Sequence, residues 1–280
     1  MTDVRDEAAT AAPVESRGNS RGDFIWYELM TTDPDAAGRF YSAVVQGWRF
    51  GERMPGDLDY RGIERSDGGN AGGVLGLDDS MRSHGARPMW LGYLNVDAVD
   101  ESVAAIERAG GKALMPAFDV PNVGRIAMVA DPQGAPFYIM KPIPPAGRPD
   151  SKSDVFSVDQ PQRVRWNELS TTDPDGAVDF YRREFGWGQE GDMDMGEMGK
   201  YRFIQSNGVN IGAIMRMPPQ VPVSSWTYYI GVDDIDRAAD AIKTGGGQVV
   251  NGPMEIPGGE FALNGLDPQG ASFGLVGPRR

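Results

Sequence analysis

Cysteine is absent from the 280-residue sequence, and histidine occurs only once. Without cysteine the chain has no disulfide, no thiolate nucleophile and no thiolate metal ligand, which fits a cytoplasmic protein without requiring one. The single histidine, His84, lies in a polar Ser-His-Gly-Ala stretch, where we expect a surface position. One imidazole cannot supply the base of a catalytic triad to two separate sites.

Long apolar runs and an excess of basic residues are also lacking. No stretch approaches the roughly 20 apolar residues that a membrane helix needs. Acidic side chains outnumber basic ones by 40 to 27, which gives a formal net charge of −13. A surface of that sign repels phosphate backbones and anionic lipid. We therefore expect neither nucleic acid nor membrane as a partner.

The length suits two domains, and the composition changes along the chain accordingly. Residues 1–22 mix acidic, small and polar types and lack the apolar core of a secretory signal, so we predict a disordered tail. A stretch rich in Pro, Ser and Asp over residues 143–161 is typical of a linker. We therefore predict one domain over residues 23–142 and another over residues 162–280.

The second domain repeats the first. The segment WYELMTTDPDAAGRFY at residues 26–41 matches WNELSTTDPDGAVDFY at residues 166–181. Tyr60-Arg61 recurs as Tyr201-Arg202, and the run that begins at Asp131, Asp-Pro-Gln-Gly-Ala, recurs at Asp267. Matches of this density along whole domains indicate a tandem duplication.

Each copy predicts the same order of strands and helices. Residues 24–30 form a short apolar and aromatic run typical of a strand, and Asp33 then caps a helix that contains Phe40 and Tyr41. A strand over residues 90–96, a helix ending at Gly110 and a hairpin across Asp131 complete the copy. The predicted class is α+β, with a strand–helix–strands unit that occurs four times in the chain.

This order of elements, with the Phe-Tyr pair, the Gly-Trp pair that follows it and the closing Asp-Pro-x-Gly hairpin, resembles the vicinal oxygen chelate superfamily. The superfamily includes glyoxalase I, bleomycin- and fosfomycin-resistance proteins and extradiol dioxygenases. The resemblance covers nearly everything from residue 24 to residue 278, and the Trp-x-Glu-Leu-x-Thr-x-Asp opening is similar to two-domain glyoxalase-like proteins of bacteria. It implies four βαβββ units that form two glyoxalase/bleomycin-resistance-type domains, each with a U-shaped, mostly antiparallel sheet.

The resemblance also implies a divalent metal on the inner face of the sheet, held by His, Gln or Glu on first strands and by Glu on last strands, which would polarise a substrate. The positions that correspond in this sequence hold Trp26 and Trp166, Leu91 and Thr227, and Tyr138 and Gly274. Indole, phenol, glycine and aliphatic groups do not bind such metals. We therefore expect no metal site and no cofactor.

Two carboxyl groups are the candidate catalytic residues. Glu28 and Glu168 follow Trp26 and Trp166 by two residues, so each shares a strand face with its tryptophan. A carboxylate among aromatic rings has a raised pKa unless it is paired, and it is then a candidate general base. The alternative is structural: Glu28 and Glu168 pair with Arg61 and Arg202 or bind backbone groups.

Aromatic side chains on the same faces are the candidate ligand-binding residues, together with two arginines. A cage of rings suits a planar or cyclic molecule, whereas the alternative is that the rings fill the space and leave no cavity. The set comprises Trp26, Tyr93, Tyr138, Trp166, Tyr229, Arg61 and Arg202.

Three functions stay open at this point. The first is a protein, monomeric or homodimeric, that binds a small aromatic or cyclic molecule without a metal. The second is a lyase, isomerase or hydroxylase-like enzyme that uses Glu28 or Glu168. The third is a metal-dependent lyase whose ligands lie elsewhere in the chain.

Overall fold

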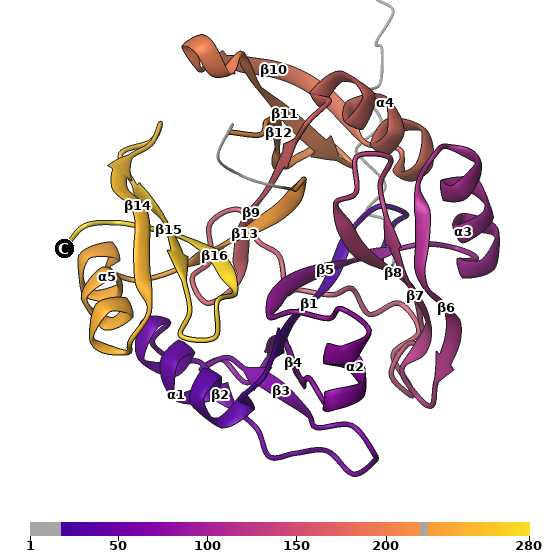
Figure 1. Ribbon diagram of the computed structural model, residues 1–280, viewed down its shortest axis with the longest axis horizontal. Helices are drawn as coiled ribbons and strands as arrows, with labels where there is room; N and C mark the ends of the chain where they lie inside the picture. Colours follow the sequence, from indigo (N-terminus) through magenta and orange to yellow (C-terminus); the bar gives the residue numbers. More distant parts are fainter. Residues whose placement is uncertain (1–17, 219–222) are drawn as a thin grey trace, which may run out of the picture.

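The computed structural model describes residues 18–218 and 223–280 (Figure 1). Residues 1–17, most of the predicted disordered tail, lie outside the described residues. Residues 18–22 are described, and the backbone N–H of Gly22 donates to the carbonyl of Asn95. None of the helices in these two described ranges has the length and apolar character that a membrane crossing requires.

The first half contains two βαβββ units. One comprises β1 (Phe24–Thr31), α1 (Pro34–Val44), β2 (Arg49–Phe50), β3 (Tyr60–Glu64) and β4 (Asn70–Gly76). A short helix, α2 (Asp79–Ser83), connects it to the next unit, which comprises β5 (Met89–Asn95), α3 (Val99–Arg108), β6 (Lys112–Val120), β7 (Gly124–Ala130) and β8 (Pro136–Pro142). His84 follows α2 and is exposed, as expected.

The second half repeats this order. Its third unit comprises β9 (Val164–Thr171), α4 (Pro174–Phe185), β10 (Gly188–Asp194), the one-turn helix η1 (Gly196–Met198), β11 (Lys200–Ser206) and β12 (Val209–Arg216). The fourth comprises β13 (Ser225–Gly231), α5 (Ile235–Thr244), β14 (Gln248–Glu255), β15 (Phe261–Leu266) and β16 (Ser272–Gly277). Four such units confirm the predicted α+β class.

Units pair within each half and form two eight-stranded mixed sheets. The strand order is β2-β3-β4-β1-β5-β8-β7-β6 in the first sheet and β10-β11-β12-β9-β13-β16-β15-β14 in the second. Each sheet curls into a U, with the edge strands at the two tips (Figure 1). The central strands β1 and β5, and likewise β9 and β13, are antiparallel partners at the base of the U.

Local sequence explains where the first helix of each half begins. The Asp33 side chain accepts a hydrogen bond from the N–H of Ala36, and Asp173 accepts one from Gly176. Each aspartate is followed by a proline at the first helical position. The missing N–H of proline costs no hydrogen bond there, because that N–H has no partner within the helix. The helices then bury the Phe-Tyr pairs that the sequence placed on one stripe.

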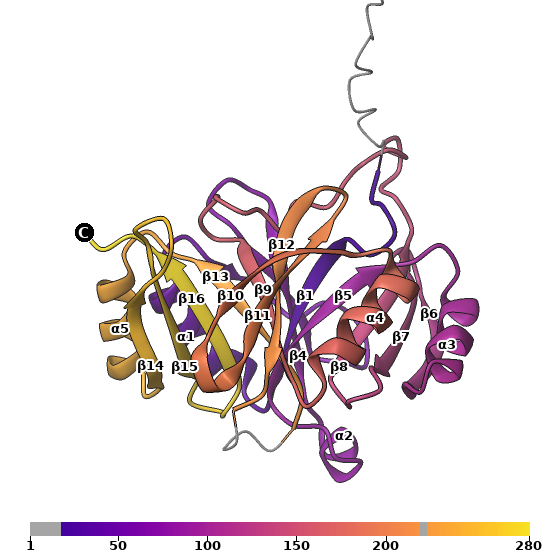
Figure 2. The same ribbon diagram turned by 90° about the horizontal axis from the view of Figure 1, so that it is seen from above.

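The outer faces of the two U-shaped sheets pack against each other through one continuous core (Figure 2). Residues at equivalent positions of the duplication meet there: Tyr27 donates to Asn167 Oδ1 at 2.8 Å, and the N–H of Gly92 donates to the Tyr228 hydroxyl at 2.7 Å. A Cβ on Gly92 would lie 2.9 Å from that hydroxyl. The halves are therefore related by an approximate twofold axis, at which the partners have different side chains.

The stretch between the two sheets is packed along the second half. No helix or strand lies within residues 143–163, yet Val155 is buried and Phe156 forms an isolated bridge with Val164. Asp154 forms an ion pair with the buried guanidinium of Arg65 in the first half. This segment therefore ties the halves together as well as connecting them.

Candidate functional site

The inner face of the second sheet carries a chain of hydrogen bonds that ends on one carboxylate. The indole of Trp166 donates to the Tyr201 hydroxyl at 2.6 Å, and that hydroxyl donates to Glu168 Oε2 at 2.8 Å. The Tyr229 hydroxyl donates to Glu168 Oε1 at 3.2 Å and accepts from the Asn264 amide at 2.9 Å. Both carboxylate oxygens of Glu168 are therefore held by phenols.

Strand register brings these residues together. Trp166 and Glu168 lie two apart on β9 and so share a face, while the alternating residues Asn167 and Leu169 point into the core between the halves. Tyr229 on β13 lies directly opposite Trp166. Residues from β9, β11, β13 and β15, which span about 100 positions of sequence, thus meet on one surface.

The first sheet carries a related set with one difference in the hydrogen bonds. Trp26 donates to the Tyr60 hydroxyl at 2.8 Å, and Tyr93 donates to Glu28 Oε2 at 2.9 Å. Tyr138 stacks on Tyr93 with ring centroids 4.3 Å apart. The other oxygen, Glu28 Oε1, is buried, and no described residue hydrogen-bonds to it.

Burial dominates the electrostatics of both carboxyl groups. It raises the pKa of Glu28 from 4.5 to about 7, against the opposing effect of the neighbouring phenols of Tyr93 and Tyr60. Burial also raises the pKa of Glu168, again opposed by the phenols of Tyr201 and Tyr229. Each sheet therefore places one carboxyl group of raised pKa on its inner face. For Glu28, both the protonated and the ionised form are accessible near neutral pH.

The two inner faces differ in exposure. In the first half Glu28, Tyr93 and Tyr138 are each 5% exposed or less, and they lie in or against an apolar cluster rich in methionine. In the second half Trp166 and Glu168 are half-buried, so solvent reaches them. The rings themselves match in burial, since Trp26 is half-buried like Trp166, and Tyr229 is buried like Tyr93. The difference in exposure therefore lies at the carboxyl groups, of which Glu28 is buried and Glu168 is half-buried.

Arg61 and Arg202 do not pair with the glutamates, contrary to the alternative drawn from the sequence. Arg61 forms ion pairs with Asp35 and Asp59, and Arg202 forms one with Asp175. Each arginine neighbours a tyrosine of the inner face along its strand, and alternation turns it to the opposite side. They anchor the first turns of α1 and α4, and we remove them from the candidate ligand-binding set.

The inner faces carry few groups of the kinds that bind metal ions. No three carboxyl or imidazole groups gather closely enough to hold an ion anywhere in residues 18–218 and 223–280. Each inner-face set described above has one carboxylate, and the phenol and indole groups around it donate hydrogen bonds to it and to each other. Such donors lack the several anionic or imidazole ligands that a divalent ion needs.

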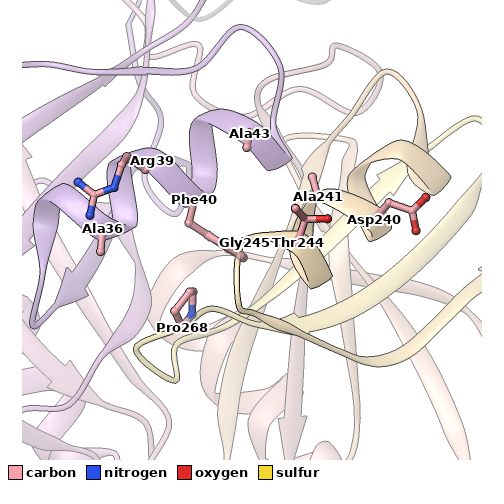
Figure 3. Close-up of a pocket in the computed structure, with 9 residues that line it drawn as sticks. All are labelled: Ala36, Arg39, Phe40, Ala43, Asp240, Ala241, Thr244, Gly245 and Pro268. Carbon is pink, nitrogen blue, oxygen red and sulfur yellow. The ribbon is translucent and has the colours of Figure 1, made fainter.

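A surface hollow of about 580 Å³ lies at the contact between the halves, away from the inner faces (Figure 3). Phe40 of α1 and Ala241 and Gly245 of α5 line it. The charged heads of Arg39 and Asp240 point away from each other at its two sides (Figure 3). It brings no set of polar groups together, so we treat it as a consequence of helix packing.

Three residues of the second site were not singled out from the sequence. Tyr201 recurs with Tyr60 in the repeat, but the sequence pattern made the adjacent arginines the candidates. Asn264 and Phe203 have no counterpart of the same type in the first half, so the repeat gave no signal for them. Only the pairing of strands shows that they face Trp166 and Glu168.

Comparison with known proteins follows the same division of the chain. The family described as Glyoxalase/Bleomycin resistance protein/Dioxygenase superfamily matches residues 24–139 and again residues 163–275. A protein of Mycobacterium tuberculosis (strain CDC 1551 / Oshkosh), named "Putative glyoxylase CFP32", is 32% identical over 90% of this chain and 94% of its own length. The anthracycline biosynthesis protein DauV of Streptomyces sp. (strain C5) is 29% identical over 90% of this chain and 91% of its own.

Solved structures share the fold at lower identity. The Mn(II)-bound glyoxalase from Novosphingobium aromaticivorans aligns with a TM-score of 0.62 and 18% identity, and covers 94% of this chain and 84% of its own. A homoprotocatechuate 2,3-dioxygenase variant from B. fuscum aligns with a TM-score of 0.60 and 15% identity, over 96% and 74% of the two chains. With the family match in both halves, the chain belongs to the glyoxalase/bleomycin resistance protein/dioxygenase superfamily, as a two-domain member.

Proposed function

We propose that this protein binds a small planar or cyclic molecule on the inner face of its sheets, without a metal ion. The observation that carries the proposal is the hydrogen-bonded Trp–Tyr and Tyr–Glu set, which occurs in both halves on the face that is not used to pack them together. Rings supply stacking area at low entropic cost, and the carboxyl group supplies an orienting hydrogen bond.

The names of two relatives support an aromatic ligand. The proteins DauV and DnrV, which are 29% and 28% identical to this chain, are named for anthracycline biosynthesis. Anthracyclines contain fused planar rings that carry hydroxyl and quinone oxygens. A surface of tryptophan and tyrosine with a polar centre suits that chemistry.

A second candidate is an enzyme that uses Glu168 or Glu28 as a general base. The raised pKa of both carboxyl groups favours it, because a base works best when its pKa lies near the working pH. The exposed edge of Glu168 would meet a substrate, whereas Glu28 is covered. In this case the same ligand would be converted and not only held.

Calorimetric titration with alizarin, a planar dihydroxyanthraquinone, tests the proposal. We expect saturable binding by the full chain, and a loss of roughly tenfold or more in affinity for Trp166→Ala, because a stacked ring contributes about 1–3 kcal/mol. Arg202→Ala serves as the control and should leave affinity unchanged, since Arg202 is paired with Asp175 on the other side of the strand.

The two candidates separate on Glu168→Gln. A binding protein keeps its affinity within a few-fold, because the amide preserves the shape of the carboxyl group and one acceptor oxygen. An enzyme loses conversion of the bound compound, followed by mass spectrometry of the incubated mixture. Absence of binding to alizarin and to the smaller 1,4-naphthoquinone would contradict the proposed ligand class.

A further inference from the structure

The tandem duplication allows the inner faces to be compared position by position. One row of side chains crosses four strands of the first sheet as Trp26, Tyr93, Tyr138 and Met128. The equivalent row of the second sheet is Trp166, Tyr229, Gly274 and Asn264. The tryptophan and the first tyrosine are kept, while the outer two positions change from large and apolar to small or polar.

At the base of the sheet, too, apolar side chains of the first half are replaced by polar ones in the second half. Leu91, the cross-strand partner of Glu28, is replaced by Thr227, the cross-strand partner of Glu168. Met30, two residues beyond Glu28 on the same strand face, is replaced by Ser170. Within the described residues neither hydroxyl makes a hydrogen bond, although both side chains are half-buried.

The opposite wall of the second face gains an aromatic ring. Phe203 occupies the position of Gly62, and each is paired through β12 or β4 to the glutamate of its half. Its ring lies edge-on to Trp166 and to Tyr201, with centroids 6.1 Å and 5.9 Å apart. The second face therefore has an aromatic wall on one side of Glu168 and hydroxyl groups with unused hydrogen-bonding capacity on the other.

Helix α2 adds to the difference. It lies at one end of the strands of the first sheet (Figure 2), and Met81 and Ala86 of the connection that contains it pack against the apolar cluster. The connection spans residues 77–88 in the first half, whereas β12 and β13 are joined by residues 217–224. The first face thus carries an apolar cluster to which its own connection contributes Met81 and Ala86.

We propose that the ligand site lies in the second half alone and accepts one planar ring with a hydroxyl- or carbonyl-bearing edge. This inference rests on the proposed function and states where in the chain the ligand binds. The ligand ring lies against the contacting side chains of Trp166 and Phe203, and its polar edge meets Thr227, Ser170 and the side-chain oxygen of Asn264. The first half serves as the structural partner, with its inner face occupied by methionine, leucine and tyrosine side chains.

The absence of cysteine supplies a direct test of location that needs no ligand. Thr227→Cys and Leu91→Cys place a single thiol at equivalent positions, and each is treated with monobromobimane, a small bicyclic reagent. We expect the Thr227 variant to react at least about 100-fold faster, because a thiol beneath the apolar cluster reacts only when the structure opens. Equal rates would overturn the proposal.

A second pair of variants keeps the test decisive if the Leu91 variant does not fold. Ser170→Cys and Met30→Cys repeat the comparison one strand away, with circular dichroism of each variant compared with the parent chain. Fast reaction at Ser170 and slow reaction at Met30 supports the location, and the reverse order overturns it. Methionine positions tolerate replacement better than rigid core positions, since the side chain is flexible.

Alizarin then distinguishes the location from the ligand class. If both proposals hold, alizarin slows labelling at Thr227→Cys at least about tenfold by occupying the site, and calorimetry gives one molecule per chain. Copying the first half into the second, with Thr227→Leu and Asn264→Met together, should abolish that binding. If Thr227→Cys reacts faster than Leu91→Cys but alizarin does not slow its labelling, the proposed ligand class is refuted and the accessible face in the second half is still supported. Two molecules per chain, or binding that survives the double variant, refutes the location.

Discussion

Glu28 is a carboxyl group that is only 3% exposed and has one oxygen without a hydrogen-bond donor among the described residues. Glu168, its counterpart, is half-buried and accepts a phenol on each oxygen. Burial raises the pKa of both groups, and phenols on both oxygens oppose this effect at Glu168. A buried anion with a vacant lone pair is costly, whereas a protonated carboxyl group loses much less on burial.

This contrast predicts a pH dependence of stability. Because burial raises the pKa of Glu28 from 4.5 to about 7, the folded state binds its proton at pH values where the unfolded state has released it. The free energy of unfolding from this group should therefore fall as the pH rises from about 4.5 to 7, by roughly 3 kcal/mol in all. Glu28→Gln, which cannot ionise, should be more stable than the parent chain at pH 8 and lose that advantage at pH 4.5.

Urea unfolding at pH 4.5, 6 and 8 measures the effect. Glu101→Gln, at an exposed position of α3, is the matched control and should follow the parent chain at every pH. Other buried acids such as Asp131 and Asp267 also titrate, so the difference between parent and Glu28→Gln is the relevant quantity. A difference that stays constant with pH would show that Glu28 does not ionise in this range.

At the scale of single elements, the aspartate before each first helix determines where that helix begins. Asp33 and Asp173 occupy equivalent positions and accept from the N–H three residues on, at 2.9 Å and 3.1 Å. The helices that they begin present Phe40 and Tyr41, or Phe180 and Tyr181, to the shared core. The cap therefore sets the register of side chains that hold the two halves together.

Asp33→Ala should lower the free energy of unfolding by about 1 kcal/mol, because the replacement leaves a backbone donor without its side-chain acceptor. Asp33→Ser should recover most of the loss, since a hydroxyl can accept the same bond. The midpoint of urea unfolding reports both. Equal losses for alanine and serine would mean that the negative charge of Asp33 at the helix N-terminus, and not its hydrogen bond, is what stabilises this end of α1.

At the scale of the whole molecule, the duplication appears as reciprocal contacts between the halves. The Tyr41 hydroxyl donates to Asp267 Oδ2 at 3.2 Å, and the Tyr181 hydroxyl donates to Asp131 Oδ2 at 3.1 Å. Each aspartate also accepts from backbone N–H groups of its own turn, so its position is fixed by the hairpin. The Asp-Pro-Gln-Gly turn of one half thus holds the first helix of the other.

We predict that the two halves unfold as one cooperative unit, since the main apolar core contains side chains from both. Tyr41→Phe removes the donor to Asp267 and the acceptor for the Trp90 indole, both buried, and should cost about 2 kcal/mol. Tyr181→Phe should cost a similar amount, because it removes the same pair of bonds at the equivalent position.

Differential scanning calorimetry tests this prediction through the number of transitions. A single transition, moved to lower temperature in each variant, is the expected result. Two separate transitions in the parent chain would show that the halves are independent. An unchanged Tm in both variants would show that water replaces the lost partners at this interface.

Local signals in the sequence are sufficient to identify the duplication, the α+β units and the family, because helix caps, strand alternation and turn residues recur in the same order in both halves. The sequence also placed Glu28 and Glu168 on a face with their tryptophans, since residues two apart on a strand must share a face. The pairing of units within each half is seen only in the structure, because adjacent strands of a sheet can come from distant segments.

The partners of those carboxyl groups depend on how the strands pair in the folded protein. The arginines next to Tyr60 and Tyr201 were candidates from sequence, and alternation along β3 and β11 sends the phenols inward and the guanidinium groups outward. Whether an inner face is filled or accessible depends on side chains from several strands and on α2 above them. Volume and exposure are sums over residues far apart in the chain, so no local pattern can fix them.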